Sequence, residues 1–178
     1  MGIAIRDLGL AEAQPLQQLF RSAMRDLAGG VSIVTIGTGA GRTGLTATSV
    51  SSLSVEPPAL IVCVNRSSSS FAALNRHGAF AVNILEARHA ALAERFSGRG
   101  GLKGEARYAG ASWTRLVTGA PILEGALAAF DCEVEEMIER HSHAVVIGRV
   151  VAVQLSDEAE PLLYWRGGYG ALAPAAEG

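Results

Sequence analysis

The fold is decided by residues 127–138, LAAFDCEVEEMI, and residues 144–155, AVVIGRVVAVQL. The second stretch is apolar and rich in β-branched side chains, which favour strands over helices, and the first combines apolar residues with four acidic ones. Only the short segment 139–143, ERHSH, separates them. This arrangement predicts two long antiparallel strands joined as a hairpin.

Shorter elements are expected around this hairpin. Apolar residues at helical spacing, N-cap residues and glycine stops predict helices over 16–27, 67–76 and 86–96. Strands are expected over 31–36, 59–64, 80–85, 162–169 and 45–55, the last becoming a polar loop before Pro57 and Pro58, with a glycine-rich turn over 37–44 and an irregular segment over 97–113. Because helices do not alternate strictly with strands, the pattern favours an antiparallel barrel with helices at its rim.

The composition excludes several classes of protein. The chain has 178 residues, which fits one domain, and a net charge of −2, which argues against binding nucleic acid or an anionic membrane. No apolar run reaches the roughly 18 residues of a membrane span, and residues 1–15 do not resemble a signal peptide, so we expect a cytoplasmic protein. Cys63 and Cys132 lie in apolar segments and are interpreted as reduced thiols.

The charge fraction points to a buried interface. Charged residues make up 18% of the chain, whereas about a quarter is usual for a soluble domain. An oligomer interface is the simplest place for the extra apolar surface.

Residues 39–44, GAGRTG, match the dinucleotide-binding pattern G-x-G-x-x-G. That site requires a helix to begin at the glycines, so that its amides meet the pyrophosphate. The following residues, LTATSVSS, are poor helix formers, and no acidic residue stands about 20 positions further on. We therefore interpret this segment as a hairpin turn.

Two clusters of hydroxyl side chains flank the predicted strand 59–64. They are Thr46, Thr48, Ser49, Ser51 and Ser52 before it, and Ser67, Ser68, Ser69 and Ser70 after it. Hydroxyls and free amides at a helix start suit a phosphate, although a solvated loop with an N-cap stays open. Tyr169 follows two glycines, which suits contact with a flat ligand, while core packing is the alternative.

His141 and His143 lie at the tip of the long predicted hairpin. An H-x-H pair can bind metal, but no third ligand stands at a useful spacing, so no metal site is expected. A serine hydrolase is also disfavoured, because the chain has no G-x-S-x-G motif.

The ordered motifs of residues 16–172 resemble the flavin-reductase-like family of short-chain NAD(P)H:flavin oxidoreductases. The segments that carry the resemblance are 44–58 (GLTATSVSSLSVEPP), 80–85 (FAVNIL), 92–96 (LAERF), 119–125 (GAPILEG) and 162–167 (LLYWRG). The resemblance implies a mainly β fold with peripheral helices: a split β-barrel of the Greek-key, FMN-binding type, forming a homodimer. Residues 1–15 would be an N-terminal extension and residues 173–178 a C-terminal tail.

The resemblance also implies the site. FMN or FAD would accept a hydride from NADH or NADPH, and the reduced flavin would pass to a partner monooxygenase. Flavin-binding positions carried over from the family are Thr46, Ala47, Thr48, Ser49, Val50, Ser51, Ser52, Ser67, Ser68, Ser69, Ser70, Phe96 and Tyr169. We expect the hydroxyls of Ser49, Ser51 and Ser52 to anchor the flavin phosphate.

His143 would position the nicotinamide. The family often has Gly-Asp-His at this hairpin, whereas this chain has His141-Ser142-His143, so only the histidine matches. Two alternatives stay open: a flavin-binding module without reductase turnover, and a pyridoxamine-phosphate oxidase-like activity. The sequence leaves open the choice between FMN and FAD, and between NADH and NADPH.

Overall fold

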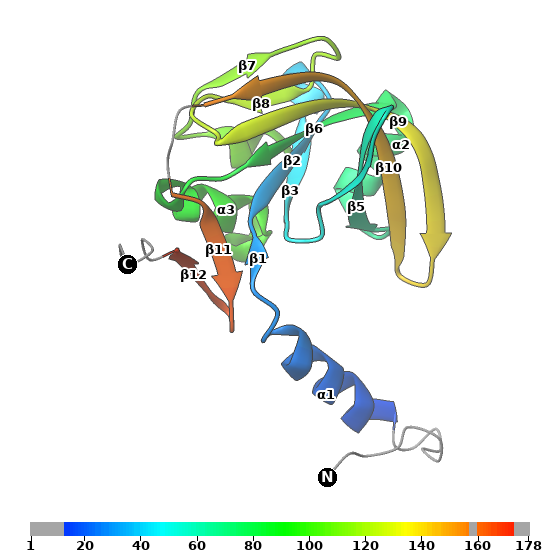
Figure 1. Cartoon of the computed structure of the whole chain (residues 1–178), viewed down its shortest axis with the longest axis vertical. Helices are drawn as coiled ribbons and strands as arrows, with labels where there is room; N and C mark the ends of the chain where they lie inside the picture. Colours follow the sequence, from blue (N-terminus) through cyan, green and yellow to red (C-terminus); the bar gives the residue numbers. More distant parts are fainter. Residues whose placement is uncertain (1–12, 157–159, 173–178) are drawn as a thin grey trace.

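One antiparallel sheet of seven strands dominates the fold. The computed structural model describes residues 13–156 and 160–172. The strand order is β3-β2-β6-β9-β10-β5-β4. These strands are β2 (Ser32–Ile36), β3 (Thr43–Ala47), β4 (Ser51–Val55), β5 (Pro58–Asn65), β6 (Ala79–Ile84), β9 (Ala128–Arg140) and β10 (His143–Leu155). Figure 1 shows these strands curving into one body.

Two small antiparallel sheets complete the strands: β1 (Gly29–Gly30) with β11 (Leu162–Trp165) and β12 (Gly168–Ala171), and β7 (Trp113–Arg115) with β8 (Pro121–Leu123). The α-helices are α1 (Ala13–Met24), α2 (Ser69–His77) and α3 (Ala90–Phe96). Short 3-10 turns are η3 (Gly39–Gly41), η4 (Ala87–His89), η5 (Arg99–Gly101) and η6 (Gly104–Tyr108).

The long hairpin predicted from the sequence is confirmed and organises the sheet. β10 pairs with β9 from His143 opposite Arg140 to Leu155 opposite Ala128. Its other edge pairs with β5, starting with His143 opposite Asn65. The predicted mainly β, antiparallel fold with few helices is therefore confirmed.

The core has two main parts. Buried side chains from the sheet, including Val34, Val62, Phe80 and Val146, form one cluster with α2. A second cluster lies under α3 and combines Phe96, Tyr108 and Leu123 with Val31 and with residues of β2 and β11. Because burial of this apolar surface is the main stabilising contribution, the two clusters hold α2 and α3 against β3.

Several predicted elements differ in the structure. Residues 51–55 form strand β4 rather than a polar loop, because they pair with β5, and only 48–50 lie between β3 and β4. The single strand predicted over 162–169 is replaced by the hairpin of β11 and β12. The short strands β7 and β8 were not predicted. In the predicted helix 86–96, only 90–96 is α-helical. The G-x-G-x-x-G segment forms η3 and then continues into β3, as its interpretation as a turn requires.

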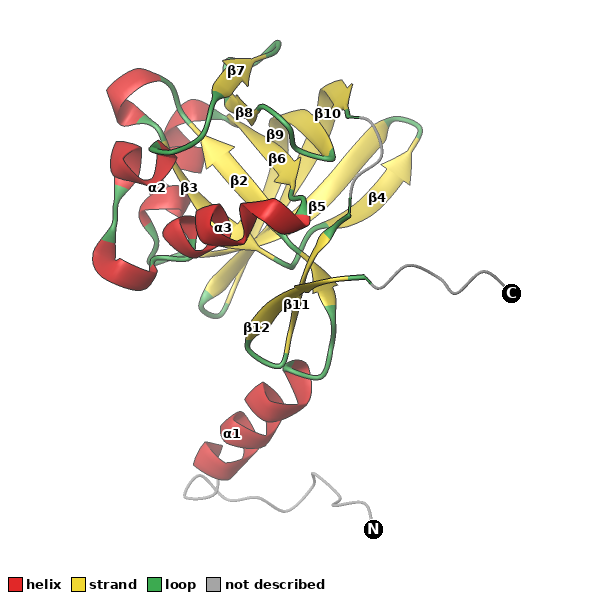
Figure 2. Cartoon of the chain, turned by 90° about the vertical axis from the view of Figure 1, so that its left-hand side faces the viewer, coloured by secondary structure: helices red, strands yellow, loops and turns green. Residues whose placement is uncertain are grey.

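Helix α1 projects away from the sheet, as Figures 1 and 2 show. Its apolar residues Leu16, Leu19, Phe20 and Met24 are exposed. The segment after the helix is held by the β11–β12 turn, where Arg25 Nη2 donates to the Arg166 carbonyl at 2.8 Å. Of the predicted N-terminal extension 1–15, residues 1–12 lie outside the described residues. The predicted C-terminal tail 173–178 lies entirely outside them.

Among the helices of residues 13–156 and 160–172, none combines the length and the apolarity needed to cross a bilayer. Cys63 and Cys132 are both free thiols. Burial raises the pKa of the Cys132 thiol to about 12, so this thiol is protonated at neutral pH.

Candidate functional site

Two adjoining cavities lie along β3, and both are bordered by Ser97. The first, which we call the tyrosine cavity, has a volume of about 200 Å³. It is lined by Val31, Thr46, Ala47, Thr48, Ser97, Arg99, Tyr164 and Tyr169. It therefore lies between the end of β3 and the β11–β12 hairpin, which stands below the sheet in Figure 2.

The second cavity, which we call the serine cavity, is larger, at about 710 Å³. Its lining residues are Leu45, Arg66, Ser67, Ser68, Ser69, Ser70, Ala72, Phe96, Ser97, Lys103 and Arg107. Hydroxyl groups, the first turn of α2 and three basic side chains thus surround one space. Such a combination of amides, hydroxyls and positive charge suits an anion.

The serine loop, residues 67–70, is ordered by Asn65. The Asn65 side-chain oxygen accepts hydrogen bonds from the Ser67 amide at 2.9 Å and the Ser67 hydroxyl at 2.8 Å. The Ser68 hydroxyl donates to the Asn65 carbonyl and accepts from the Phe71 amide, which makes Ser68 the N-cap of α2. Capping starts the helix at this point, so that its first turn borders the serine cavity.

Hydrogen bonds hold the Arg107 side chain in place at the edge of the serine cavity. Its guanidinium donates to the carbonyls of Gly44 and Leu102, the latter at 2.9 Å. Burial lowers the pKa of Arg107 from its usual value, but an arginine keeps its charge at neutral pH. Arg107 therefore supplies a fixed positive charge beside β3.

The hydroxyl block 46–52, predicted as one flavin-binding unit, is divided by the structure. Thr48 lines the tyrosine cavity, as does Thr46, whose hydroxyl donates to the Ala93 carbonyl at 2.5 Å. The Ser49 hydroxyl bonds the backbone of Cys63, with its oxygen 3.2 Å from the Cys63 nitrogen.

Val50, Ser51 and Ser52 instead border an apolar groove lined by residues of β4, β5, β6, β9 and β10. This groove is distinct from both cavities on β3. That Ser49, Ser51 and Ser52 anchor a phosphate therefore stays a prediction.

Phe96 and Tyr169, the two predicted aromatic positions, stand in different surroundings. Phe96 is 1% exposed and packs edge-on to Tyr108, with ring centroids 5.0 Å apart, so it forms the floor of the serine cavity. Gly44 permits this approach, because a Cβ there would lie 2.8 Å from the Phe96 ring. Tyr169 lines the tyrosine cavity and packs against Tyr164. Burial raises its pKa, so Tyr169 carries its proton at neutral pH.

His143 begins β10 and is exposed to solvent. Its Nδ1 lies 2.9 Å from the Ser142 hydroxyl oxygen, and its register partners are Arg140 and Asn65. Since Asn65 also holds the serine loop, His143 stands next to the strand end that leads into the serine cavity.

Comparison with known proteins identifies the family. Residues 24–173 match the family model described as flavin reductase like domain. The chain belongs to this family. The resemblance seen in the sequence is therefore confirmed.

Relatives of this flavin reductase family member span most of its length. It is 48% identical over 145 residues to FMN reductase (NADH) RutF 2 of Methylorubrum extorquens, covering 82% of this chain and 83% of the relative. It is 39% identical over 164 residues to FMN reductase (NADH) RutF of Bradyrhizobium diazoefficiens, covering 90% of each.

Solved structures of flavin reductases are also similar to this chain. BorF, the flavin reductase component of a bacterial two-component tryptophan halogenase, matches with a TM-score of 0.81 and 29% identity over 88% of this chain and 98% of BorF. NADH:FAD oxidoreductase SgcE6 of Streptomyces globisporus, in complex with NAD and FAD fragments, matches with a TM-score of 0.82 and 26% identity over 96% of this chain and all of SgcE6.

Sequence reasoning missed several residues of this flavin reductase's cavities. They are Arg66, Ser97, Arg99, Lys103, Arg107 and Tyr164. Four of them lie in the glycine-rich segment 97–113, where periodicity carries no information. The basic residues of that segment were a usable signal, because positive charge beside a serine-rich helix start suits a phosphate.

The Thr46 hydroxyl is predicted to be structural, because its bond to Ala93 ties α3 to β3. Thr46→Val should lower the free energy of unfolding by about 0.5–1.5 kcal/mol, measured by urea denaturation. Thr48→Val is the matched control, since Thr48 borders the same cavity, and it should change the stability by much less. Equal losses in the two variants would contradict the assignment.

Proposed function

We propose that this flavin reductase transfers a hydride from NADH to FMN and that the two cavities on β3 together receive the flavin. NAD(P)H-dependent flavin reduction is the activity of the family to which the chain belongs. The choice of FMN and NADH is supported by the names of its relatives in M. extorquens and B. diazoefficiens. The observation that carries the placement is the junction of a basic, serine-lined cavity with a tyrosine-lined one at Ser97.

The residues present fit a flavin phosphate in the serine cavity. Its first helical turn offers amides and hydroxyls, and Arg66, Lys103 and Arg107 offer positive charge. The ring system would then extend along β3 into the tyrosine cavity, beside Thr48 and Tyr169. Bound flavin supplies the hydride-accepting ring, and the protein's task is to hold it and to shield one face.

Neither titratable residue predicted for the site is placed as a buried general base. Tyr169 keeps its proton, and His143 is exposed at the hairpin tip. Hydride transfer requires two rings held face to face, so orientation is the contribution expected from the protein. His143 would contact the nicotinamide as it enters from solvent.

His143→Ala should raise the KM for NADH several-fold while the affinity for FMN stays nearly constant. Steady-state NADH oxidation with added FMN measures the first quantity, and a fluorescence titration measures the second. A modest fall in kcat is consistent, because a misplaced ring also reacts more slowly. Loss of FMN binding with normal NADH kinetics would place His143 at the wrong part of the site.

The same assay tests the alternative of a flavin-binding module without turnover. The replacement of the family's Gly-Asp by His141-Ser142 is the observation that favours this alternative. A wild-type protein that binds FMN but oxidises neither NADH nor NADPH would make it the correct function. Steady-state turnover would exclude this alternative. For an active reductase, we propose that the reduced flavin passes to a partner monooxygenase in the cytoplasm.

The position of the phosphate is tested by comparing FMN with riboflavin. Lys103→Ala and Ser69→Ala should each weaken FMN binding by about 1–3 kcal/mol, because a phosphate loses a partner, and should leave riboflavin binding unchanged. Ser51→Ala and Ser52→Ala are the controls on β4. If only the β4 variants weaken FMN binding, the phosphate lies with Ser51 and Ser52, as predicted from the sequence.

We further propose that residues 16–172 form a split-barrel domain that dimerises next to the flavin. Exposed apolar residues gather beside the groove on β4 and β10: Leu53, Val55, Val153 and Leu155. The exposed apolar residues of α1 offer a second such surface. Thr48 borders the tyrosine cavity and Val50 borders the groove, so an interface there would adjoin the flavin.

Val153→Asp should therefore yield a monomer and weaken FMN binding, because a charge in an apolar interface is costly to bury. Light scattering should give about twice the chain mass of 18.5 kDa for the wild type and the single mass for the variant. Val117→Asp is the matched control, since Val117 is also exposed but lies outside the groove. A monomeric wild type would refute the dimer.

A further inference from the structure

Arg66 joins the serine loop to the tip of the β9–β10 hairpin by three contacts. Its amide donates to the Ser142 carbonyl at 3.0 Å. Its Nη1 donates to the His141 carbonyl at 2.9 Å, and its Nη2 forms an ion pair with the Glu139 carboxylate. Two of its three guanidinium nitrogens are thus engaged with the hairpin, although Arg66 also borders the serine cavity.

The neighbouring residue extends this connection in both directions. Asn65 is the register partner of His143 at the end of the β5–β10 pairing. It also accepts the hydrogen bonds that order Ser67 and Ser68. The dipeptide Asn65-Arg66 therefore touches the serine loop on one side and the hairpin tip on the other.

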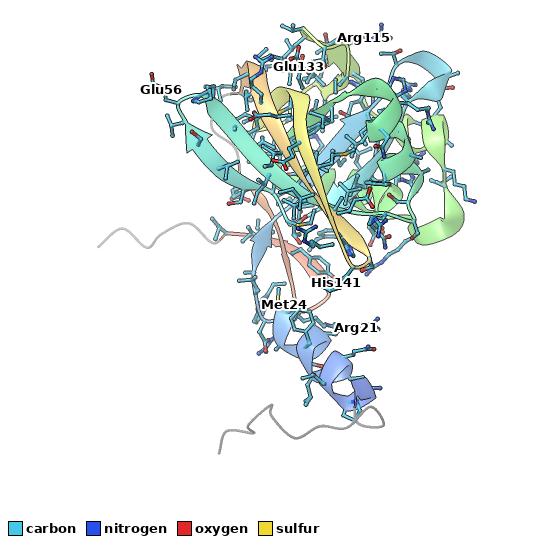
Figure 3. The ribbon with its side chains drawn as sticks, turned by 90° about the vertical axis from the view of Figure 1, so that its right-hand side faces the viewer. Arg21, Met24, Glu56, Arg115, Glu133 and His141 are labelled. Carbon is cyan, nitrogen blue, oxygen red and sulfur yellow. The ribbon has the colours of Figure 1, made fainter. Side chains whose placement is uncertain are left out.

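The turn at the hairpin tip has an unfavourable backbone conformation, which contacts with Arg66 can stabilise. His141 has φ of 51°, in the left-handed region that residues other than glycine rarely adopt. The His141 carbonyl is the group that Arg66 binds, so the guanidinium stabilises the turn that precedes His143. Figure 3 shows His141 at the end of this hairpin.

We propose that Arg66 is a positioning residue for the nicotinamide: it fixes the hairpin tip, and with it His143, relative to a flavin phosphate in the serine cavity. This inference rests on the proposed function. The Arg66–Glu139 pair is about half exposed on both sides, at 43% and 48%, and such pairs contribute little to global stability. Its effect is therefore local, on the placement of the turn.

A substitution of Glu139 distinguishes this positioning role of Arg66 from direct binding of the phosphate. If Arg66 serves only as a phosphate ligand, removing the Glu139 charge leaves the NADH kinetics unchanged, because the guanidinium stays in the serine cavity. If Arg66 holds the hairpin, the same change loosens the tip although Glu139 itself lines neither cavity. The informative variant is thus Glu139→Gln, and Arg66→Ala alone would confound the two roles.

The hairpin also provides a matched control. Glu133 lies on β9, is 48% exposed like Glu139, and forms an ion pair with Arg149, its register partner on β10. Figure 3 shows Glu133 at the end of the molecule opposite His141. Glu133→Gln therefore removes an equivalent ion pair of the same hairpin without touching its tip.

The test measures steady-state kinetics with NADH and FMN, the Kd of FMN, and hydrogen exchange of the Arg66 amide. Glu139→Gln should raise the KM for NADH about two- to five-fold, the loss expected for one exposed ion pair, with kcat and the FMN Kd within about two-fold of wild type. The Arg66 amide should exchange faster. Glu133→Gln should match the wild type in all four quantities.

Three results would overturn the inference. Glu139→Gln kinetics equal to wild type would do so, as would an increase in KM of the same size in Glu133→Gln. A change confined to the FMN Kd would make Arg66 a phosphate ligand only. These results all require an active wild type, whereas a wild type without NADH oxidation would overturn the proposed function, and this inference with it.

Discussion

The pairing of β10 with both β9 and β5 is the constraint on which the rest of the structure depends. One edge of β10 completes the long hairpin, and the other aligns the end of β5 with its start, so that His143 lies opposite Asn65. Because register in a sheet is set along the whole strand, the core residue Val146 and the candidate site residue His143 are positioned together. The serine loop then begins at the exit of β5, beside the hairpin tip.

The physical character of the site follows from this geometry. Its groups bind and orient: hydroxyls and amides of a capped helix start, a fixed Arg107, and Tyr169 with its proton retained. This suits a reaction in which the cofactor carries the chemistry and the protein supplies position. Apolar surface is exposed at the groove of β4, which Val50 borders, and also along α1. In the proposed dimer, a second copy covering the groove would exclude water from the proposed flavin site.

Sequence reasoning succeeded where a signal repeats along the chain. The long hairpin, the strand 59–64 and the helix predicted over 67–76 carry local patterns of apolar, β-branched or capping residues, and the structure contains all three within one or two residues of the predicted bounds. The turn at 39–44 was recognised because a helix could not follow it. Reasoning failed at β4, whose serines look like a solvated loop, because its strand character comes from pairing with β5.

The sequence by itself determined the fold class, the long hairpin and, through its ordered motifs, the family, because these depend on local propensity and on the spacing of residues. Only the tertiary structure decided which hydroxyls share a cavity. It separated Ser51 and Ser52 from the serine loop and joined Lys103 and Arg107 to that loop from a distant segment. The connection of Arg66 to His141 and Glu139 was equally invisible, since contacts across more than 70 residues exist only once strand pairing has set the register.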